Sequence, residues 1–339
     1  MPRPYNRKPM AQPSPELAVE TRALRRVYRS RGEEIVALQS VDLQVHRGRI
    51  YGVLGPNGAG KTTLIKILVT LLLPSGGEAY VDGLNVVTEF RKLRHRIAMV
   101  SGGENSGYGL LKVREQLWLF SQLYGLPSKE AHRRIDELLE RLGLAEVAGR
   151  KVSSLSSGMR QKMNLIRGLV SDPKILFLDE PTVALDVGAA RDMREEVQRW
   201  VADDPSRTVI LTTHYMMEAD ELCARVAIVN RGRVIAEGAP AALKQRVREH
   251  VIIDLIVGRG EPLLPALRAV EGVTGASAQE EDGADHLSVI LADDSAMPRV
   301  LATVERSGRS IQGVQKREPS LEDAFVTLVG RSMSEEEGE

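Results

Sequence analysis

The sequence has a single cysteine and no excess of charge of either sign. Cys223 stands alone among 339 residues, which excludes an intrachain disulfide and suits a reducing compartment. We expect this thiol to be buried and inert. Lysine plus arginine and aspartate plus glutamate each number 46, so the net charge is zero. Because a broad nucleic-acid interface normally needs a basic surface, we expect no nucleic-acid partner.

The sequence also lacks long apolar runs. The longest candidate, Leu64 to Leu73, contains Lys66 and is well short of the ~20 residues that cross a bilayer. No apolar core follows the basic residues near the N-terminus, so the sequence predicts no signal peptide. The contents of 42 % hydrophobic and 27 % charged residues are ordinary for a globular protein. We therefore expect a soluble, cytoplasmic protein that meets a membrane only through a partner.

Helix and strand patterns alternate along most of the chain. Residues 1–20 hold five prolines and little to bury, and we interpret them as a flexible leader. From 21 to 245 the alternation predicts an α/β fold with a parallel sheet and helices packed on it. Expected strands include 41–45, with Val41, Leu43 and Val45 on one face, 175–178, 208–212 and the pair 226–230 and 233–237. Expected helices lie at 158–169 and 191–201 and within 112–142, where Gly125 and Pro127 divide them.

The composition changes near residue 245, and the segment 246–331 predicts a second domain. Its order of patterns, β-α-β-β-α-β, is typical of a small α+β domain of the ferredoxin-like kind. The spacing of Ser320 and Asp323 after Pro319 is that of a capping box and predicts a last helix. The tail 332–339 is acidic and is expected to be disordered. The expected strands are 251–257, 273–279, 286–291 and 311–315, and the expected helices are 263–270 and 297–304.

A glycine loop, Gly55–Thr63, separates two apolar runs near the start of the first domain. It follows Ile50–Leu54 and precedes Leu64–Leu68, which reads as strand, loop and helix. The pattern G-x-x-x-x-G-K-[ST] in that setting indicates a phosphate-binding loop, where Lys61 reaches the outer phosphates and Thr62 holds Mg²⁺. Glycines let consecutive N–H groups point at an anion, and the helix adds the positive end of its dipole. The alternative is a glycine-rich turn without a ligand.

Two carboxylates follow a second apolar run. Ile175–Leu178 is typical of a central strand buried on both faces, and it ends at Asp179 and Glu180. Ligands bind α/β sheets at such carboxyl ends. Asp179 fits the Mg²⁺-side carboxylate of a P-loop NTPase, and Glu180 fits the group that polarises an attacking water. The alternative is a solvated turn, which the phosphate loop upstream makes the weaker interpretation.

A third element, Leu155–Gln161 with the sequence LSSGMRQ, stands just before a helix. With it the chain resembles the nucleotide-binding subunit of an ABC (ATP-binding cassette) transporter over residues 21–240. That family carries a phosphate loop, a signature, an apolar strand ending in Asp-Glu, a D-loop and a switch histidine, in this order. Val183–Asp186 matches the D-loop and His214 matches the switch histidine. The resemblance implies a P-loop NTPase cassette with a mixed sheet core, an antiparallel β subdomain and a helical subdomain at about 88–170.

The resemblance also implies roles for individual residues, with ATP and Mg²⁺ as cofactors. Glu180 and His214 are the expected catalytic residues, and Tyr28 is the expected aromatic that stacks on adenine. His214 by itself could be a surface histidine, and Tyr28 could be a strand residue that packs nearby. The expected ATP-binding residues are Tyr28, Gly55, Asn57, Gly58, Ala59, Gly60, Lys61, Thr62 and Thr63. The expected metal ligands are Thr62 and Asp179, the signature residues acting across a dimer are Ser156, Ser157 and Gly158, and the D-loop residue is Asp186.

Three departures from the family pattern stand out. The signature has Ser157 in place of glycine and Met159 in place of glutamine, whereas Ser156 and Gly158 are kept. The segment 101–105 lacks the glutamine of the family's Q-loop, so either water or Glu104 does that work, or coupling to the partner differs. The D-loop has Val183-Ala184 in place of the usual small pair.

One phosphate loop and one signature in a single chain imply a dimer. In the family these two motifs contact the same ATP only across a head-to-tail pair, so we expect either two copies or a paired homologue. ATP would close the pair and hydrolysis would reopen it, driving a membrane-spanning permease encoded separately. The protein would then be peripheral on the inner face of the cell membrane, with 88–170 as the docking surface.

The region after 245 narrows the class of transporter. Its end, Glu318–Phe325, resembles the C-terminal extension of drug- and polysaccharide-export subunits, and the stretches 102–104 with Tyr108 and 113–115 point the same way. The expected function is the ATP-hydrolysing motor of an exporter. The alternatives are a soluble ABC ATPase acting on nucleic acid or ribosomes, a P-loop kinase and a GTPase. No residue identifies the transported molecule, because that molecule contacts the permease.

Overall fold

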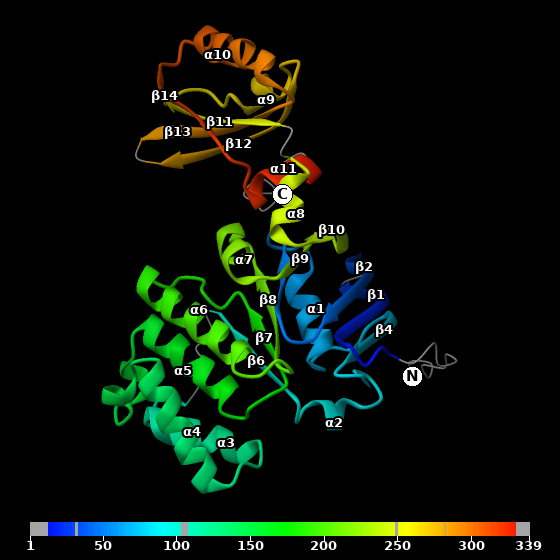
Figure 1. Cartoon of the computed structure of the whole chain (residues 1–339), viewed down its shortest axis with the longest axis vertical. Helices are drawn as coiled ribbons and strands as arrows, with labels where there is room; N and C mark the ends of the chain where they lie inside the picture. The colour runs from blue at the N-terminus through cyan, green and yellow to red at the C-terminus, as the bar shows by residue number, and fades with distance from the viewer. Residues whose placement is uncertain (1–12, 31–32, 103–107, 248–249, 282, 330–339) are drawn as a thin grey trace. The chain divides into compact units, whose positions relative to one another are not determined.

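The computed structural model describes residues 13–30, 33–102, 108–247, 250–281 and 283–329. Within these ranges, no helix combines the length and the apolar character that a membrane crossing requires. The chain divides into two compact units, the first made of Met1–Ile50 and Thr62–Leu211, the second of Tyr51–Lys61 and Thr212–Glu339. Figure 1 labels their helices and strands along the chain. The expected acidic tail, 332–339, lies outside the described residues.

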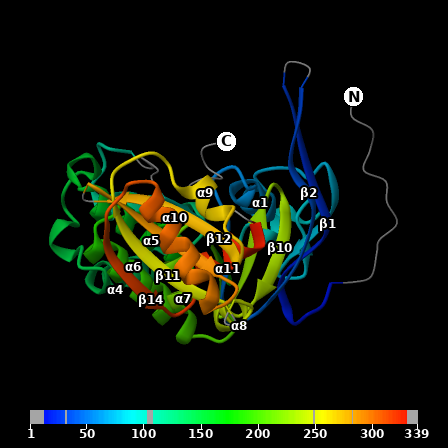
Figure 2. The same ribbon diagram turned by 90° about the horizontal axis from the view of Figure 1, so that it is seen from above.

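The first unit contains an antiparallel sheet at its N-terminal end. Its strands are β1 (Leu17–Ser30), β2 (Glu33–His46), β4 (Gly76–Val81) and β5 (Leu84–Asn85), in the order β2-β1-β4-β5. Figure 2 shows β1 and β2 side by side as a long hairpin. Alternate residues of β2 are buried, Val41, Leu43 and Val45 among them, as the period-two pattern predicts.

The expected leader is too long. Residues 1–12 lie outside the described residues, but β1 already begins at Leu17. Leu17 is 6 % exposed and Val19 1 % exposed, and Leu17 pairs with His46 of β2. A continuous run of buried residues from Leu17 to Thr21 therefore continues the β subdomain back into the segment that its prolines had suggested was a leader.

Parallel strands covered by helices form the rest of the first unit. β6 (Ile97–Ser101) runs parallel to β7 (Ile175–Asp179), and β8 (Thr208–Thr213) follows β7 in the strand order. Every residue of β7 and β8 is buried, as expected for strands inside an α/β protein. Figure 1 shows α5 (Ser157–Leu169) alongside α6 (Val187–Ala202). Further helices are α1 (Lys61–Leu68), α2 (Phe90–Leu93), α3 (Val113–Leu123) and α4 (Ser128–Arg141).

The second unit combines three strands of the cassette with the C-terminal domain. The strands follow the order β10-β9-β3, with β9 (Arg225–Asn230) antiparallel to β10 (Arg233–Gly238) and parallel to β3 (Ile50–Leu54). Parallel and antiparallel neighbours together confirm the mixed sheet. Positive φ angles at Arg231 (47°) and Gly232 (74°) form the tight turn of the β9–β10 hairpin. Helices α7 (Met216–Leu222) and α8 (Pro240–Gln245) belong to the same unit.

The C-terminal domain has the predicted ferredoxin-like topology. Its strands β11 (Val251–Gly258), β12 (Val273–Glu281), β13 (Ala284–Leu291) and β14 (Ile311–Arg317) are all antiparallel, in the order β12-β13-β11-β14. Helices α9 (Leu264–Arg268) and α10 (Met297–Arg306) pack on one face, where Leu267 and Val304 join Leu255 in a single apolar core. The capping box predicted for α11 (Leu321–Val329) is present, because Ser320 N donates to Asp323 Oδ2 (2.7 Å) and Asp323 N donates to Ser320 Oγ (3.2 Å).

Candidate nucleotide site

The glycine loop follows β3 with a backbone that only small residues allow. A Cβ at Gly55 would lie 2.1 Å from the carbonyl oxygen of Val229, so a side chain cannot be accommodated there. Gly58 and Gly60 have φ angles of 80° and 106°, in the region that favours glycine. Ala59 is buried, and its carbonyl accepts from Gly232 N at 2.9 Å. The loop is therefore held in a fixed curl, as a phosphate cradle requires.

Lys61 is folded back into the loop. Its ammonium donates to the carbonyl oxygens of Gly55 (2.6 Å) and Pro56 (3.1 Å), and the residue is only 4 % exposed. A buried ammonium needs such oxygen partners, because desolvation of a charge is costly. These carbonyls hold the ammonium of Lys61 within the loop. A bound phosphate can replace them as the acceptor of its hydrogen bonds.

Thr62 joins the loop to the carboxylate at the end of β7. Its hydroxyl donates to Asp179 Oδ1 at 3.2 Å, across 117 positions of the sequence. Asp179 is 7 % exposed, because it is the last residue of a fully buried strand. The structure thus brings together the two residues that were predicted as Mg²⁺ ligands, and both present oxygen atoms to one point.

Glu180 begins the turn after β7 in a conformation unusual for a residue with a side chain. Its φ is 53°, in the left-handed region that costs about 1–3 kcal/mol for residues other than glycine. A Cβ at Gly102 would lie 1.8 Å from the carbonyl oxygen of Glu180, and Gly102 N donates to Asp179 O at 2.7 Å. The chain after β6 therefore passes directly against the Asp179-Glu180 backbone. Residues 103–105, where the Q-loop glutamine is missing, lie outside the described residues.

Tyr28 lies near the phosphate loop, as the resemblance requires. Its hydroxyl is 3.4 Å from Thr63 Oγ1, and the guanidinium of Arg26 lies 4.7 Å from its ring centre. Arg26 and Tyr28 are both in β1, so the long hairpin carries this aromatic ring to the start of α1. This contact fits both a strand residue that packs nearby and an aromatic ring placed to meet adenine, so the adenine role stays a prediction.

The signature and the D-loop meet at the N-termini of two adjacent helices. Ser156 caps α5 by accepting from Met159 N (3.2 Å), and Asp186 caps α6 by accepting from Ala189 N (2.8 Å). A Cβ at Gly158 would lie 3.0 Å from Ala189 Cβ and 3.3 Å from Asp186 Oδ2. Gly158 therefore allows α5 to approach the cap of α6. Ser156 and Ser157 are exposed at the end of the helix.

His214 directly follows β8 and is half-buried. Its ring centre lies 4.1 Å from that of Tyr215, whose backbone N–H donates to Thr213 Oγ1 at 2.9 Å. His214 thus stands at the carboxyl end of a buried strand, the position at which α/β sheets present catalytic groups.

Gln161 is the last residue of the segment LSSGMRQ, and the sequence predicted no role for it. Its side chain is 4 % exposed, donates through Nε2 to Ser101 O (3.1 Å) and accepts from Asn164 Nδ2 (3.3 Å). It therefore ties α5 to the end of β6, one residue before Gly102. The only signal in the sequence was a polar side chain on the buried face of an amphipathic helix.

Cys223 is buried, as predicted. The residue is 6 % exposed, and its Sγ would lie 2.9 Å from a Cβ at Gly52. Burial raises the pKa of this thiol well above its usual range, so it stays protonated and unreactive.

The curled glycine loop with the lysine within it, and a buried strand that ends in a carboxylate hydrogen-bonded to Thr62, define a P-loop NTPase. Residues 38–183 match the family described as ABC transporter, and residues 238–329 match the family described as ATP-binding protein DrrA1-3-like, C-terminal domain.

Relatives extend this match over most of the chain. The daunorubicin resistance ATP-binding protein DrrA3 of Streptomyces coeruleorubidus is 38 % identical over 87 % of this chain and 91 % of its own length. The Nod factor export ATP-binding protein I of Burkholderia lata is 35 % identical over 92 % of this chain and 97 % of its own length. The solved structure of the ATP-binding cassette MJ0796, dimeric and bound to ADP and Pi, has a TM-score of 0.60 at 27 % identity. The match covers 65 % of this chain and 98 % of the MJ0796 chain.

The chain belongs to the ABC transporter family of ATP-binding proteins and carries a DrrA-like C-terminal domain. The predicted cassette fold and the predicted ATPase activity are confirmed, as is the role of ATP-hydrolysing motor subunit of an exporter. The chain binds ATP. These matches favour the exporter over an ATPase that acts on nucleic acid or ribosomes.

Proposed function

We propose that this ATPase works as one half of a head-to-tail pair that drives a separate membrane-spanning permease at the inner face of the cell membrane. The observation that carries the proposal is the Thr62–Asp179 hydrogen bond, because it brings together the two expected Mg²⁺ ligands directly before Glu180. Names of relatives that mention drug resistance and Nod factor export support an outward direction of transport. Residues 17–245 form the nucleotide-binding domain in this proposal, and 246–331 form an accessory domain.

Mg²⁺ fits the oxygen donors at the loop. Thr62 and Asp179 supply a hydroxyl and a carboxylate oxygen in mutual contact, and Mg²⁺ is usually held by one or two carboxylates plus phosphates and waters. When bound, the ion neutralises charge on the phosphate oxygens. The oxygen-only character of the pair suits Mg²⁺ and not a softer metal.

The chain's own residues supply the remaining steps. The loop N–H groups and Lys61 bind the phosphates, and Tyr28 stacks on the adenine ring. Glu180 accepts a proton from the water whose oxygen bonds to the γ-phosphorus, while the bond from that phosphorus to the ADP oxygen breaks. His214 holds the water and the γ-phosphate in position. The left-handed backbone at Glu180 sets the direction in which its side chain leaves the turn after β7.

The other half of each site comes from a second chain. Ser156 and Ser157 are exposed at the N-terminus of α5 and Gly158 is buried behind them, and this helix end favours the γ-phosphate of an ATP held by the partner. Asp186 caps α6, and the absence of a side chain at Gly158 lets the two helix termini approach each other. ATP favours the closed pair because the γ-phosphate contacts both chains, and its removal reopens the pair.

Co-purification from membranes tests the proposed partner. We expect the tagged full-length chain to recover a protein with several predicted membrane spans, and reconstituted vesicles with both chains to move substrate only with ATP. Lys61→Ala in the same preparation is the control, since it should keep the complex and lose the transport. Recovery of ribosomes or DNA in place of a membrane protein would contradict the permease partner.

A further inference from the structure

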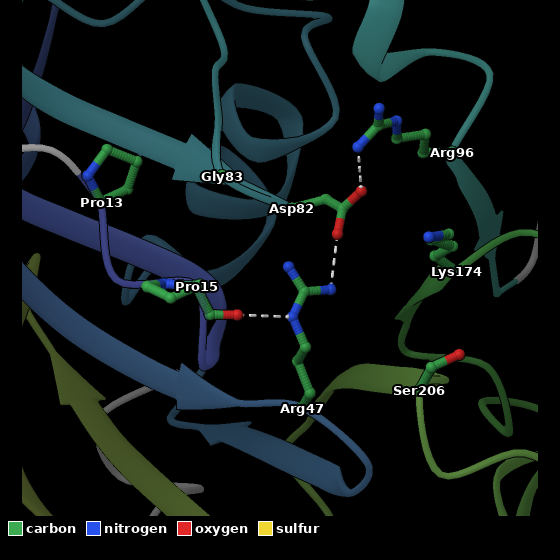
Figure 3. Close-up of a pocket in the computed structure, with 8 residues that line it drawn as sticks. All are labelled: Pro13, Pro15, Arg47, Asp82, Gly83, Arg96, Lys174 and Ser206. Atoms are coloured by element: carbon green, nitrogen blue, oxygen red, sulfur yellow. Dashed lines mark hydrogen bonds and ion pairs between the residues drawn. The ribbon is translucent and has the colours of Figure 1, made fainter.

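A cavity of about 690 Å³ with several charged lining residues lies in the first unit, and none of the nucleotide motifs lines it. Figure 3 shows the residues around it, among them Arg47, Asp82, Arg96, Lys174 and Ser206. Its volume is within the range of small-molecule sites, about 300–1,000 Å³.

The cavity lies at the amino ends of the parallel strands. Arg96 directly precedes β6, Lys174 directly precedes β7, and Ser206 stands two residues before β8. Asp179 is at the opposite end of β7, five residues on from Lys174. At about 3.3 Å a residue, that separates the cavity from Asp179 by roughly 16 Å. The cavity is therefore distinct from the proposed Mg²⁺ ligands.

Backbone hydrogen bonds hold the walls of the cavity in place. Lys174 N donates to Arg96 O (2.8 Å), Thr208 N donates to Lys174 O (3.0 Å), and Asp82 N donates to Ala18 O (2.8 Å). These bonds join the segments at Arg96, Lys174 and Thr208 to one another, and the segment at Asp82 to β1, before any ligand arrives. A pre-organised site pays less conformational entropy on binding.

A buried carboxylate joins two arginines at one wall. Asp82 accepts from Arg47 Nη1 (2.5 Å) and Arg96 Nη1 (2.6 Å), and its side chain is 4 % exposed. Arg47 also donates through Nε to Pro15 O at 3.0 Å. Each guanidinium has five N–H donors, so both arginines keep donors beyond those that Asp82 and Pro15 use. Figure 3 shows Asp82 between them, with Lys174 and Ser206 to the right in the view.

Lys174 has a different environment from the two arginines. Its ammonium forms no ion pair within 4.0 Å with any residue in the described part of the chain. Asp204 attracts it only from farther away, and that carboxylate already accepts from Ser206 N at 2.8 Å. Lys174 is exposed, so its ammonium is accessible to a ligand, and it adds its charge to those of the two arginines at the same cavity.

The lining carries three cationic side chains and one carboxylate, which gives a net charge of +2. A phosphate monoester carries about −1.5 to −2 at pH 7, whereas a carboxylate carries only −1. Arginine donors match phosphate oxygens in pairs, and lysine adds a point charge. We propose that this cavity binds the phosphate group of a small phosphorylated molecule, with Lys174, Arg47 and Arg96 as its ligands.

Calorimetric titration of the full chain with glycerol 3-phosphate tests this site. The Lys61→Ala background removes binding by the phosphate loop, and glycerol serves as the uncharged probe. We expect saturable binding of glycerol 3-phosphate that Lys174→Gln weakens by about 10- to 100-fold, the range for loss of a charged hydrogen bond. Lys174→Arg keeps the charge and should retain binding, and Lys129→Gln, at an exposed lysine on α4, should not change it.

Vesicles distinguish the source of the phosphate. Flotation with phosphatidic acid vesicles, but not phosphatidylcholine vesicles, that is lost in Lys174→Gln would assign a lipid headgroup. Binding of glycerol 3-phosphate alone would assign a soluble metabolite. With Lys61 intact, Lys174→Gln should keep normal basal ATPase activity, which verifies its fold. Absence of binding to either probe, or equal binding by Lys174→Gln and Lys129→Gln, would overturn the proposal.

Discussion

Gly102 and Glu180 approach each other so closely that a Cβ at 102 would lie 1.8 Å from the Glu180 carbonyl oxygen. The same glycine donates from its N–H to Asp179 O at 2.7 Å. The backbone that leads away from β6 thus rests on the backbone that carries both carboxylates of the nucleotide site. Any side chain at 102 must displace one of these two segments.

Gly102→Ala is therefore expected to impair hydrolysis. The clash is with backbone, which cannot turn aside, so overpacking should cost about 1–3 kcal/mol and shift Glu180. We expect a lower kcat together with a lower free energy of unfolding, measured by ATPase assay and urea denaturation. Gly149→Ala is the matched control, because a Cβ there meets nothing within 4 Å. Equal kcat values for both variants would show that the close approach does not position Glu180.

Glu180→Gln is expected to stop hydrolysis while keeping ATP binding. The amide keeps the shape of the side chain but cannot accept the water's proton, so kcat should fall by about 10²- to 10⁴-fold. The variant should form an ATP-dependent dimer, detected by size-exclusion chromatography with light scattering. Glu140→Gln, at an exposed glutamate on α4, should behave as the parent chain. Normal turnover by Glu180→Gln would mean that another group activates the water.

Lys61→Ala is expected to weaken ATP binding. The lysine now donates to Gly55 O and Pro56 O, and loss of one charged hydrogen-bonding group costs about 1.5–3 kcal/mol. That range corresponds to a Kd about 10- to 100-fold higher, measured by titration with a fluorescent ATP analogue. Lys66→Ala, on the exposed side of α1, should leave the Kd unchanged. Unchanged affinity in Lys61→Ala would exclude this lysine as a phosphate ligand.

Asp82→Asn is expected to remove part of the acid dependence of stability. Burial by itself raises the pKa of this carboxyl, but hydrogen bonds from Arg96 and Arg47 outweigh burial and hold the pKa below its ordinary value of 3.8. The contribution is therefore fully present above about pH 4 and is lost as the pH falls through the lower, folded-state pKa.

Urea denaturation measures this effect. At pH 7 the Asp82→Asn chain should be less stable by about 1.5–3 kcal/mol, and the difference should shrink toward pH 3. Asp136→Asn removes an exposed partner of Arg114 and should cost less than about 1 kcal/mol. A difference for Asp82→Asn that stays constant from pH 7 to pH 3 would show that ionisation of this carboxyl is not the cause.

Local patterns in the sequence determined most elements and the class of the protein. The run Ile175–Leu178, the glycine loop and the β-α-β-β-α-β order each depend on residues close together in the chain. Periodicity, glycine conformation and capping chemistry act over such short spans, so one sequence is enough to interpret them. The expected leader was too long because its proline content drew attention away from the strand that begins at Leu17, whose first five residues are all buried and show no period-two pattern.

Only the tertiary structure decided which distant residues meet. The packing of strands and helices determines three close approaches that no local spacing encodes. They join Thr62 with Asp179, Gly158 with Asp186, and Gly102 with Glu180. The cavity at Lys174 is the clearest case, because its residues precede different strands and look like ordinary surface charges in the sequence. Parallel strands bring their ends together whatever the length of chain between them, and that packing creates both the nucleotide site at one edge and the cationic cavity at the other.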